Sequence, residues 1–197
     1  MTRIGRLIGP LLLLAAPALA ADGVWTLRER FCMTVDGRKQ CSRGTEDLML
    51  LGGTAYYRPD AGDFWTEIGT VTTNGKSFLV RVSRQGVGRL VANRAGIDVS
   101  DMLRDFLFTY KGRIAGTRIV GGRANVNFVI DVGGDTHHVR GNAAFTGRRI
   151  GDAYPVPPPD PYYYGEATAA PARRRAPAAF SAVRSVVSRT AGWDVRP

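Results

Sequence analysis

The two cysteines, Cys32 and Cys41, are the residues with the clearest chemistry, and they flank the dipeptide Asp36-Gly37. Asp-Gly favours a two-residue hairpin turn, which would place the cysteines opposite each other in a non-hydrogen-bonded pair. The Cα separation of such a pair is about 4.5 Å, which suits a disulfide. Unpaired thiols and metal or redox chemistry are the alternatives, but zinc needs more ligands and redox pairs usually have C-x-x-C spacing. We therefore predict a structural disulfide.

Motifs of the common enzyme classes are missing from the sequence. It has no G-x-S-x-G, no Walker loop and no H-E-x-x-H, and the GVG tripeptide at 86–88 lacks the third glycine of a dinucleotide-binding loop. The pattern favours a protein that is not an enzyme, and we predict no cofactor and no metal. The alternative is a small periplasmic hydrolase or lyase that uses His138 with carboxylate pairs such as Asp131 and Asp135, or Glu46 and Asp47.

The clearest candidate binding surface lies on a predicted hairpin around Gly133-Gly134, where alternate residues face opposite sides. One side is apolar apart from His137 and should belong to the core. On the other side, His138 and Arg140 could hold an anionic group while asparagines orient it. An ordinary solvent-exposed face is the alternative. The predicted ligand-binding residues are Arg118, Asn125, Asn127, Asp131, His138, Arg140 and Asn142.

The elements that would position these residues are mainly strands. Residues 21–152 are rich in glycine and contain one proline, with many Val, Ile, Thr and aromatic residues, which is typical of short strands joined by tight turns. We predict a mainly β domain at 21–152, an antiparallel meander that closes into a small barrel or sandwich. One amphipathic helix is expected at about 99–111, because apolar residues there recur at helical spacing: Val99, Met102, Leu103, Phe106, Leu107 and Tyr110.

The segment Asp22-Gly23-Val24-Trp25 contains a G-x-W pattern that resembles the opening of lipocalins and related calycin barrels. The resemblance implies that Trp25 closes one end of a barrel, and that a late arginine stacks on it. The predicted helix between strands departs from the uninterrupted up-and-down order of those barrels.

The two ends of the chain predict its location. Residues 1–20 combine two arginines, a short apolar run and an Ala18-Leu19-Ala20 cleavage pattern, which is typical of a secretory signal peptide. Arginine far outnumbers lysine, as in GC-rich bacteria, so we expect export to a Gram-negative periplasm or secretion. Residues 153–197 hold most of the prolines and the basic cluster Arg173, Arg174 and Arg175, and we expect a disordered basic tail.

These features together predict an exported, non-enzymatic binding or envelope-interaction protein built on a disulfide-stapled β domain. The formal net charge of +10 favours anionic partners, either an envelope surface contacted by Arg173, Arg174 and Arg175 or a small anionic ligand. Export makes nucleic acid an unlikely partner, and no later segment suits a transmembrane span. A third hypothesis is an inhibitor or accessory subunit of another secreted protein, which would use loops such as RPDAGDFW at 58–65.

Overall fold

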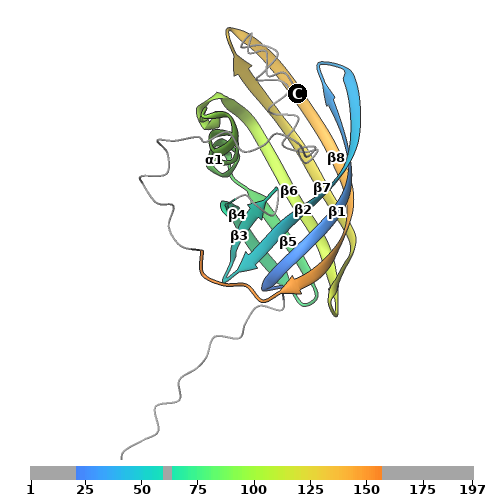
Figure 1. The fold of residues 1–197 in the computed structure, drawn as a ribbon. Helices are drawn as coiled ribbons and strands as arrows, with labels where there is room; N and C mark the ends of the chain where they lie inside the picture. The colour runs from blue at the N-terminus through green and yellow to red at the C-terminus, as the bar shows by residue number, and fades with distance from the viewer. Residues whose placement is uncertain (1–20, 60–63, 157–197) are drawn as a thin grey trace, which may run out of the picture.

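The chain folds into a closed antiparallel barrel of eight strands in sequence order, β1 to β8 (Figure 1). The computed structural model describes residues 21–59 and 64–156. The predicted signal peptide and most of the predicted tail, with its three arginines, lie outside the described residues. The strands are β1 (Gly23–Val35), β2 (Arg38–Leu51), β3 (Thr54–Arg58), β4 (Thr66–Asn74), β5 (Ser77–Val82), β6 (Leu103–Ala115), β7 (Arg118–Val132) and β8 (Asp135–Gly151).

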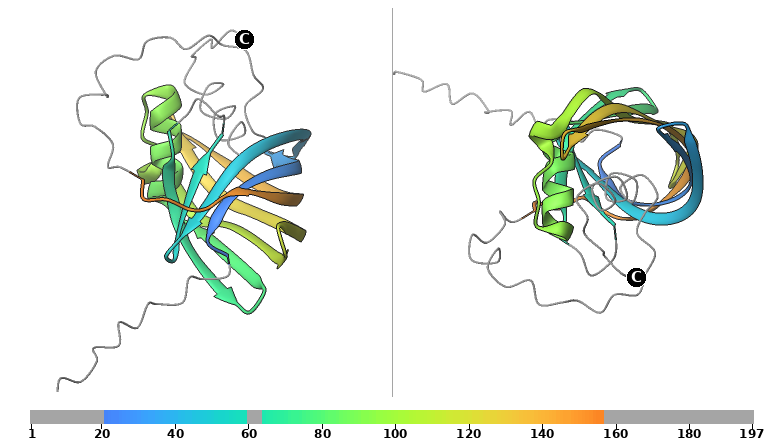
Figure 2. Two further views of the ribbon diagram at one scale, coloured as in Figure 1. Left: turned by 60° about the horizontal axis from the view of Figure 1, so that its bottom comes forward. Right: turned by 90° about the horizontal axis from the view of Figure 1, so that it is seen from above.

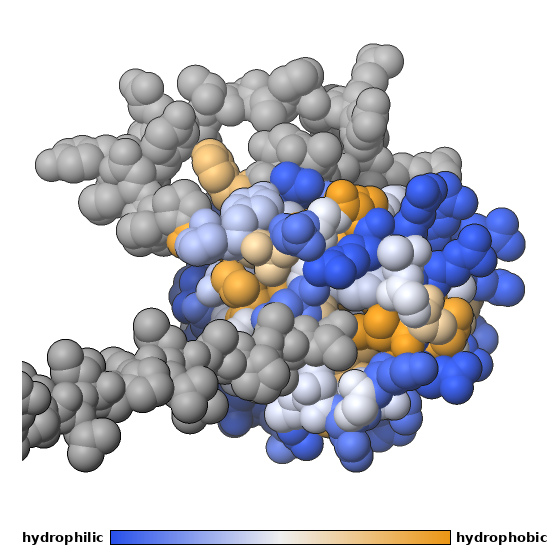
Figure 3. Space-filling view, turned by 90° about the horizontal axis from the view of Figure 1, so that it is seen from below, coloured by the Kyte–Doolittle hydropathy of each residue, from blue (hydrophilic) through white to orange (hydrophobic). Residues whose placement is uncertain are grey.

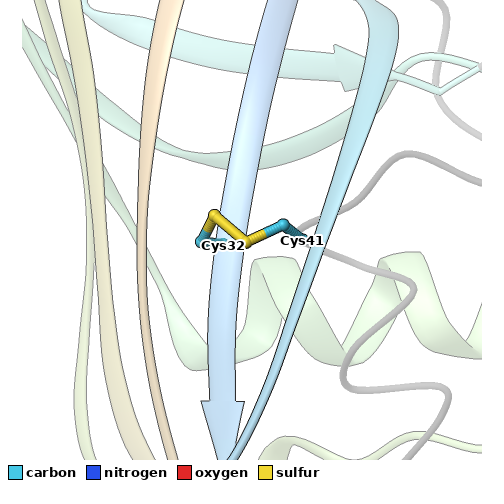
Figure 4. The surroundings of a disulfide bond; sticks show 2 residues. All are labelled: Cys32 and Cys41. Atoms are coloured by element: carbon cyan, nitrogen blue, oxygen red, sulfur yellow. A yellow bond between two sulfur atoms is a disulfide. The ribbon is translucent and has the colours of Figure 1, made fainter.

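The β1–β2 hairpin has the predicted turn and register. Asp36 and Gly37 both adopt positive φ angles, of 48° and 82°, as a tight two-residue hairpin turn requires. Cys32 pairs directly with Cys41, and the two form a disulfide with a Cα separation of 4.1 Å (Figure 4). The disulfide therefore joins neighbouring strands of the barrel wall, as the sequence predicted.

The predicted helix at 99–111 is wrong. Residues 100–102 form a short 3-10 turn, η1 (Ser100–Met102), and the segment then continues as β6. The register of β6 against β7 shifts between Arg104 and Leu107, and Asp105 there has a positive φ of 46°. This β-bulge inserts one residue into an alternating strand. Leu103 and Phe106 are therefore three positions apart because the bulge adds one residue between them, and this spacing imitates that of a helix.

The α-helix of the described residues is α1 (Arg84–Ala95), between β5 and β6. Ser83 caps its start by accepting a hydrogen bond from the Gly86 amide, and Gly96 ends it in a left-handed conformation. Three apolar residues at helical spacing, Val87, Leu90 and Val91, are buried in the core. Figure 2 shows the helix beside the ring of strands, where it contacts β4.

The core fills the barrel because inward-facing and outward-facing residues alternate along most of each long strand, apart from the bulges. On β1 the odd-numbered residues from Trp25 to Met33 are buried, whereas Arg28 and Arg30 are exposed. Trp25 is 1% exposed and its indole Nε1 donates a hydrogen bond to the Ala21 carbonyl at 3.1 Å. This agrees with the buried position that the lipocalin resemblance implies for this residue. Two acidic residues, Glu29 and Glu46, are also buried.

Candidate functional site

The predicted ligand-binding residues lie mostly on the outer face of the β7–β8 hairpin. Asn125 pairs with Asn142 and Asn127 pairs with Arg140, so these four exposed residues form one continuous patch. On the opposite side of the same strands, Val126, Phe128, Ile130 and Val139 are buried, as expected. The hairpin turn is Gly133-Gly134, because Val132 pairs with Asp135.

Two predicted residues, Asp131 and His138, line a shallow groove of about 560 Å³ at the turn end of this hairpin. Asp131 is already bound there: it forms an ion pair with Arg104 at 2.6 Å and accepts a hydrogen bond from Thr136 at 2.8 Å. The β-bulge of β6 contributes Asp105 to the same groove. The groove therefore presents an occupied ion pair beside His138, not a free acid-base pair.

Arg118 is not part of this group, because it begins β7 at the far end of the hairpin and pairs with Arg148. His137 is also separate from His138. Its Nδ1 lies 2.6 Å from a carboxyl oxygen of Asp36 in the β1–β2 turn, whose other oxygen accepts a hydrogen bond from the His138 amide. The hydrogen bond with His137 lowers the pKa of Asp36. These contacts tie two hairpin turns together at one end of the barrel.

The carboxylate pair proposed for an enzyme, Glu46 and Asp47, does not converge. Glu46 is buried inside the barrel, while Asp47 forms an ion pair with Arg58 and accepts a hydrogen bond from Thr26. Neighbouring strand residues face opposite sides, so the barrel wall separates the two groups. Asp135 lies at the hairpin turn, apart from both.

A larger charged surface, which sequence reasoning missed, covers the outer side of five neighbouring strands. We call it the basic face. Its register brings like charges directly opposite each other, because Arg30 pairs with Arg43, Lys111 with Arg123 and Arg118 with Arg148. All members are exposed. The basic face consists of Arg28, Arg30, Lys39, Arg43, Lys111, Arg118, Arg123, Arg140 and Arg148.

The positive charges of the basic face are not neutralised by carboxylates of the described residues. Among the carboxylates on the outer side of these strands, Asp47 and Asp131 are each paired with an arginine outside the basic face, and Asp105 lies in the groove at the β-bulge. No ion pair within residues 21–59 and 64–156 involves a member of the basic face. Like charges opposite each other destabilise a sheet. The face therefore carries repulsion that an external anion would relieve.

The RPDAGDFW loop is described only at its two ends. Arg58 lies over the ring of Trp65 at 4.6 Å, and the Trp65 indole Nε1 donates a hydrogen bond to the Tyr154 hydroxyl at 2.6 Å. The neighbouring Phe64 is 73% exposed. Viewed from below, the described surface is mostly hydrophilic and its apolar patches are interrupted by hydrophilic residues (Figure 3). The loop therefore offers a small aromatic cluster beside the basic face.

A second missed feature is a cluster inside the barrel, formed by Glu29, Glu46, Tyr57 and Tyr110, which we call the carboxyl-tyrosine cluster. The four residues are at most 4% exposed. Tyr57 donates a hydrogen bond to Glu46 Oε2 at 2.5 Å. The sequence signal was present, because alternation from Trp25 through Leu27 to Phe31 places Glu29 on the apolar side of β1.

Burial controls the protonation of the carboxyl-tyrosine cluster. It raises the pKa of Glu29 to about 7, an effect that the interaction with Glu46 partly opposes. Burial and the neighbouring charge of Glu29 also raise the pKa of Glu46 well above its usual value. Burial and the two carboxyl groups also raise the tyrosine pKa values. Burial therefore favours the protonated form of both carboxyl groups, and Glu29 titrates near neutral pH.

Neither a metal cluster of the usual kind nor a membrane-spanning helix is found in the described part of the chain. No group of three or more His, Cys, Asp or Glu residues there could hold an ion. No described helix has the length and apolar character needed to cross a bilayer. The carboxyl-tyrosine cluster differs from such a metal cluster because half of its side chains are phenols.

Comparisons with known proteins assign no family. No model of a protein family matches the chain, and no curated protein matches its sequence. A search of solved structures finds the crystal structure of the ywiB protein from Bacillus subtilis, at 12% identity and a TM-score of 0.26. That match covers 64% of this chain and 92% of the other chain.

Proposed function

We propose that this protein is an exported, non-enzymatic binding protein whose basic face docks on an extended anionic surface of the cell envelope. One observation carries the proposal: three cross-strand pairs of like-charged side chains on the outer wall have no carboxylate partner among the described residues. A multivalent anion would bridge these pairs and remove their mutual repulsion.

The rigid sheet suits this role because it fixes the spacing of the charges. Neighbouring strands lie about 4.8 Å apart, and residues two apart on a strand are separated by roughly 7 Å. The disulfide between Cys32 and Cys41 lies within the same wall and links the strands that carry Arg30 and Arg43. The cations are therefore held in a preformed array, which lowers the entropy lost on binding.

The predicted ligand residues extend this surface. Arg140 belongs to the basic face, and Asn125, Asn127 and Asn142 lie between its cations on β7 and β8. Their amides can donate hydrogen bonds to phosphate or carboxylate oxygens. His138 lies at the end of the array beside the groove. The patch is thus one part of a larger anion-binding face in this proposal.

Binding to vesicles tests the proposal. We expect the mature chain to bind vesicles that contain phosphatidylglycerol but not pure phosphatidylcholine, with affinity falling steeply as salt rises. The variant Arg30→Gln/Arg43→Gln should bind about thirtyfold more weakly, since each lost charge costs about 1 kcal/mol at an anionic surface. The matched control Lys76→Gln/Arg84→Gln removes the same charge from exposed positions outside the basic face.

Two further arms separate the sources of binding. A variant with Arg173, Arg174 and Arg175 changed to Gln reports the contribution of the tail. A soluble acidic polysaccharide in place of vesicles distinguishes a glycan from a lipid headgroup. Equal losses in the Arg30/Arg43 variant and in the Lys76/Arg84 control would show that only net charge matters and would reject the basic face as the site.

A further inference from the structure

The carboxyl-tyrosine cluster places two acidic groups where the barrel is otherwise apolar. Along β1 the neighbours of Glu29 on the inner side are Leu27 and Phe31, and both are buried. Across the strands, Glu46 pairs with Leu27. Carboxylates in such surroundings are strongly disfavoured unless a proton, a cation or hydrogen-bond donors compensate them.

The described residues supply no cation to compensate them. Within the part of the chain that the structure describes, no Arg, Lys or His forms an ion pair with Glu29 or Glu46. The sequence neighbours of Glu29, Arg28 and Arg30, face outward and are exposed. Among the described residues, no basic side chain therefore neutralises the cluster.

The atoms that could bind a cation here are all oxygens, and several of them have no hydrogen-bond partner. Both carboxyl oxygens of Glu29 and Oε1 of Glu46 are buried without a hydrogen bond of regular geometry. The hydroxyl of Tyr110, a residue that is 0% exposed, faces the same carboxyl groups and is also unsatisfied. The four side chains come from β1, β2, β3 and β6, so they converge from different parts of the barrel wall.

We propose that the carboxyl-tyrosine cluster is an internal site for one small hard cation of the calcium type. Two carboxyl groups that can each bind through two oxygens, together with two phenol oxygens, provide up to six donors. Calcium accepts six to eight oxygen ligands in irregular geometry, whereas magnesium demands a strict octahedron and keeps several waters. A buried site enclosed by apolar side chains favours calcium.

Cation and proton compete for this site, and the exchange balances. Without a cation, protons can compensate the two buried carboxyl groups. When the cation binds, both carboxyl groups ionise and their protons leave to solvent. Affinity should therefore rise with pH, in contrast to any effect of the outer face. The net charge of +10 also weakens non-specific cation binding to the outer surface.

Thermal denaturation and calorimetry of the mature chain test the proposal with calcium chloride and magnesium chloride as probes. At about pH 8 and constant ionic strength, calcium should raise Tm and bind with a stoichiometry of one. Magnesium should have a smaller effect. Lowering the pH should weaken the calcium effect, because protons compete for the same carboxyl groups.

Three variants make the result specific. Glu29→Gln and Glu46→Gln keep the side-chain shape and remove charge, so they should fold while losing the calcium-dependent rise in Tm. Tyr110→Phe should weaken calcium binding severalfold. The matched control Glu67→Gln changes an exposed glutamate and should behave as wild type.

Two results would overturn the proposal. One is a wild-type Tm at about pH 8 that does not change with calcium, which would mean that protons alone compensate the cluster. The other is a calcium response that survives in Glu29→Gln. Neither result bears on vesicle binding, because the basic face lies on the other side of the barrel wall.

Discussion

The variant Glu29→Gln should remove the part of the pH dependence of stability between about pH 4.5 and pH 7 that Glu29 contributes, while the buried Glu46 carboxyl, whose pKa is also raised, contributes the remainder. Burial raises the pKa of Glu29 from 4.5 to about 7 in the folded chain. The folded state therefore holds a proton that the unfolded state has released over this interval. Stability is highest below about pH 4.5 and falls as the pH rises toward 7, after which this effect is complete.

The size of the effect follows from the pKa difference. One pKa unit corresponds to about 1.4 kcal/mol. A rise from 4.5 to about 7 therefore gives a loss on the order of 3 kcal/mol at neutral and higher pH. A glutamine side chain cannot ionise, so the Glu29→Gln variant should be more stable than wild type at about pH 8 by a similar amount, while the two should converge near pH 4.5.

Urea denaturation in the presence of a chelator measures both curves without bound cations. Glu67→Gln is the control, because Glu67 is exposed and its ion pair with Arg89 is long, at 3.4 Å. Asp36 acts in the opposite direction, since its lowered pKa costs stability only as the solution becomes acidic. Parallel curves for wild type and Glu29→Gln between about pH 5 and pH 8 would refute the assignment of a buried titrating carboxyl group.

Three further predictions concern the framework around these sites, and each is measured by urea denaturation at fixed pH. Replacing Cys32 and Cys41 by serine should cost about 2 to 3 kcal/mol, because the closed loop is short; an unchanged midpoint would argue against a disulfide in the purified protein. Ser83→Ala should cost about 1 kcal/mol through the lost N-cap of α1, and a neutral result would mean that packing alone defines that end. Gly86→Ala should cost about 1 to 3 kcal/mol, because its Cβ would lie 2.3 Å from the Ile68 carbonyl oxygen, whereas the exposed neighbour Gln85→Ala should be nearly neutral.

The turns and the alternation of the long strands could be predicted from the sequence because both are local. Asp36-Gly37 and Gly133-Gly134 fix the register of their hairpins, and that register places the cysteines opposite each other and the polar patch on one face. Asn-Gly at 74–75 is the dipeptide that favours a two-residue turn, but the turn after β4 lies one residue later, because Asn74 itself pairs with Ser77. Local turn chemistry predicts that a hairpin exists better than it predicts which two residues form the turn.

The helix was misplaced because a bulge and a helix can give the same apolar spacing over a few residues. Asp105 lies in the bulge that adds one residue to β6, and this extra residue makes Leu103 and Phe106 look like neighbours on a helical face. The true helix has an N-cap at Ser83 and a terminating Gly96, but it also contains Gly86 and Gly88. Glycine lowers helix propensity. Here Gly86 is required because the helix approaches β4 closely, a tertiary reason that no local pattern reveals.

The basic face and the carboxyl-tyrosine cluster could not be predicted from individual motifs because both arise from barrel closure. Arg43 lies thirteen positions after Arg30, and Lys111 lies twelve positions before Arg123. The two members of each pair nevertheless lie directly opposite each other on neighbouring strands. Tyr57 and Tyr110 meet Glu46 only when β3 and β6 are brought to the same interior. Composition showed an excess of cations but did not indicate which side of a strand would carry them.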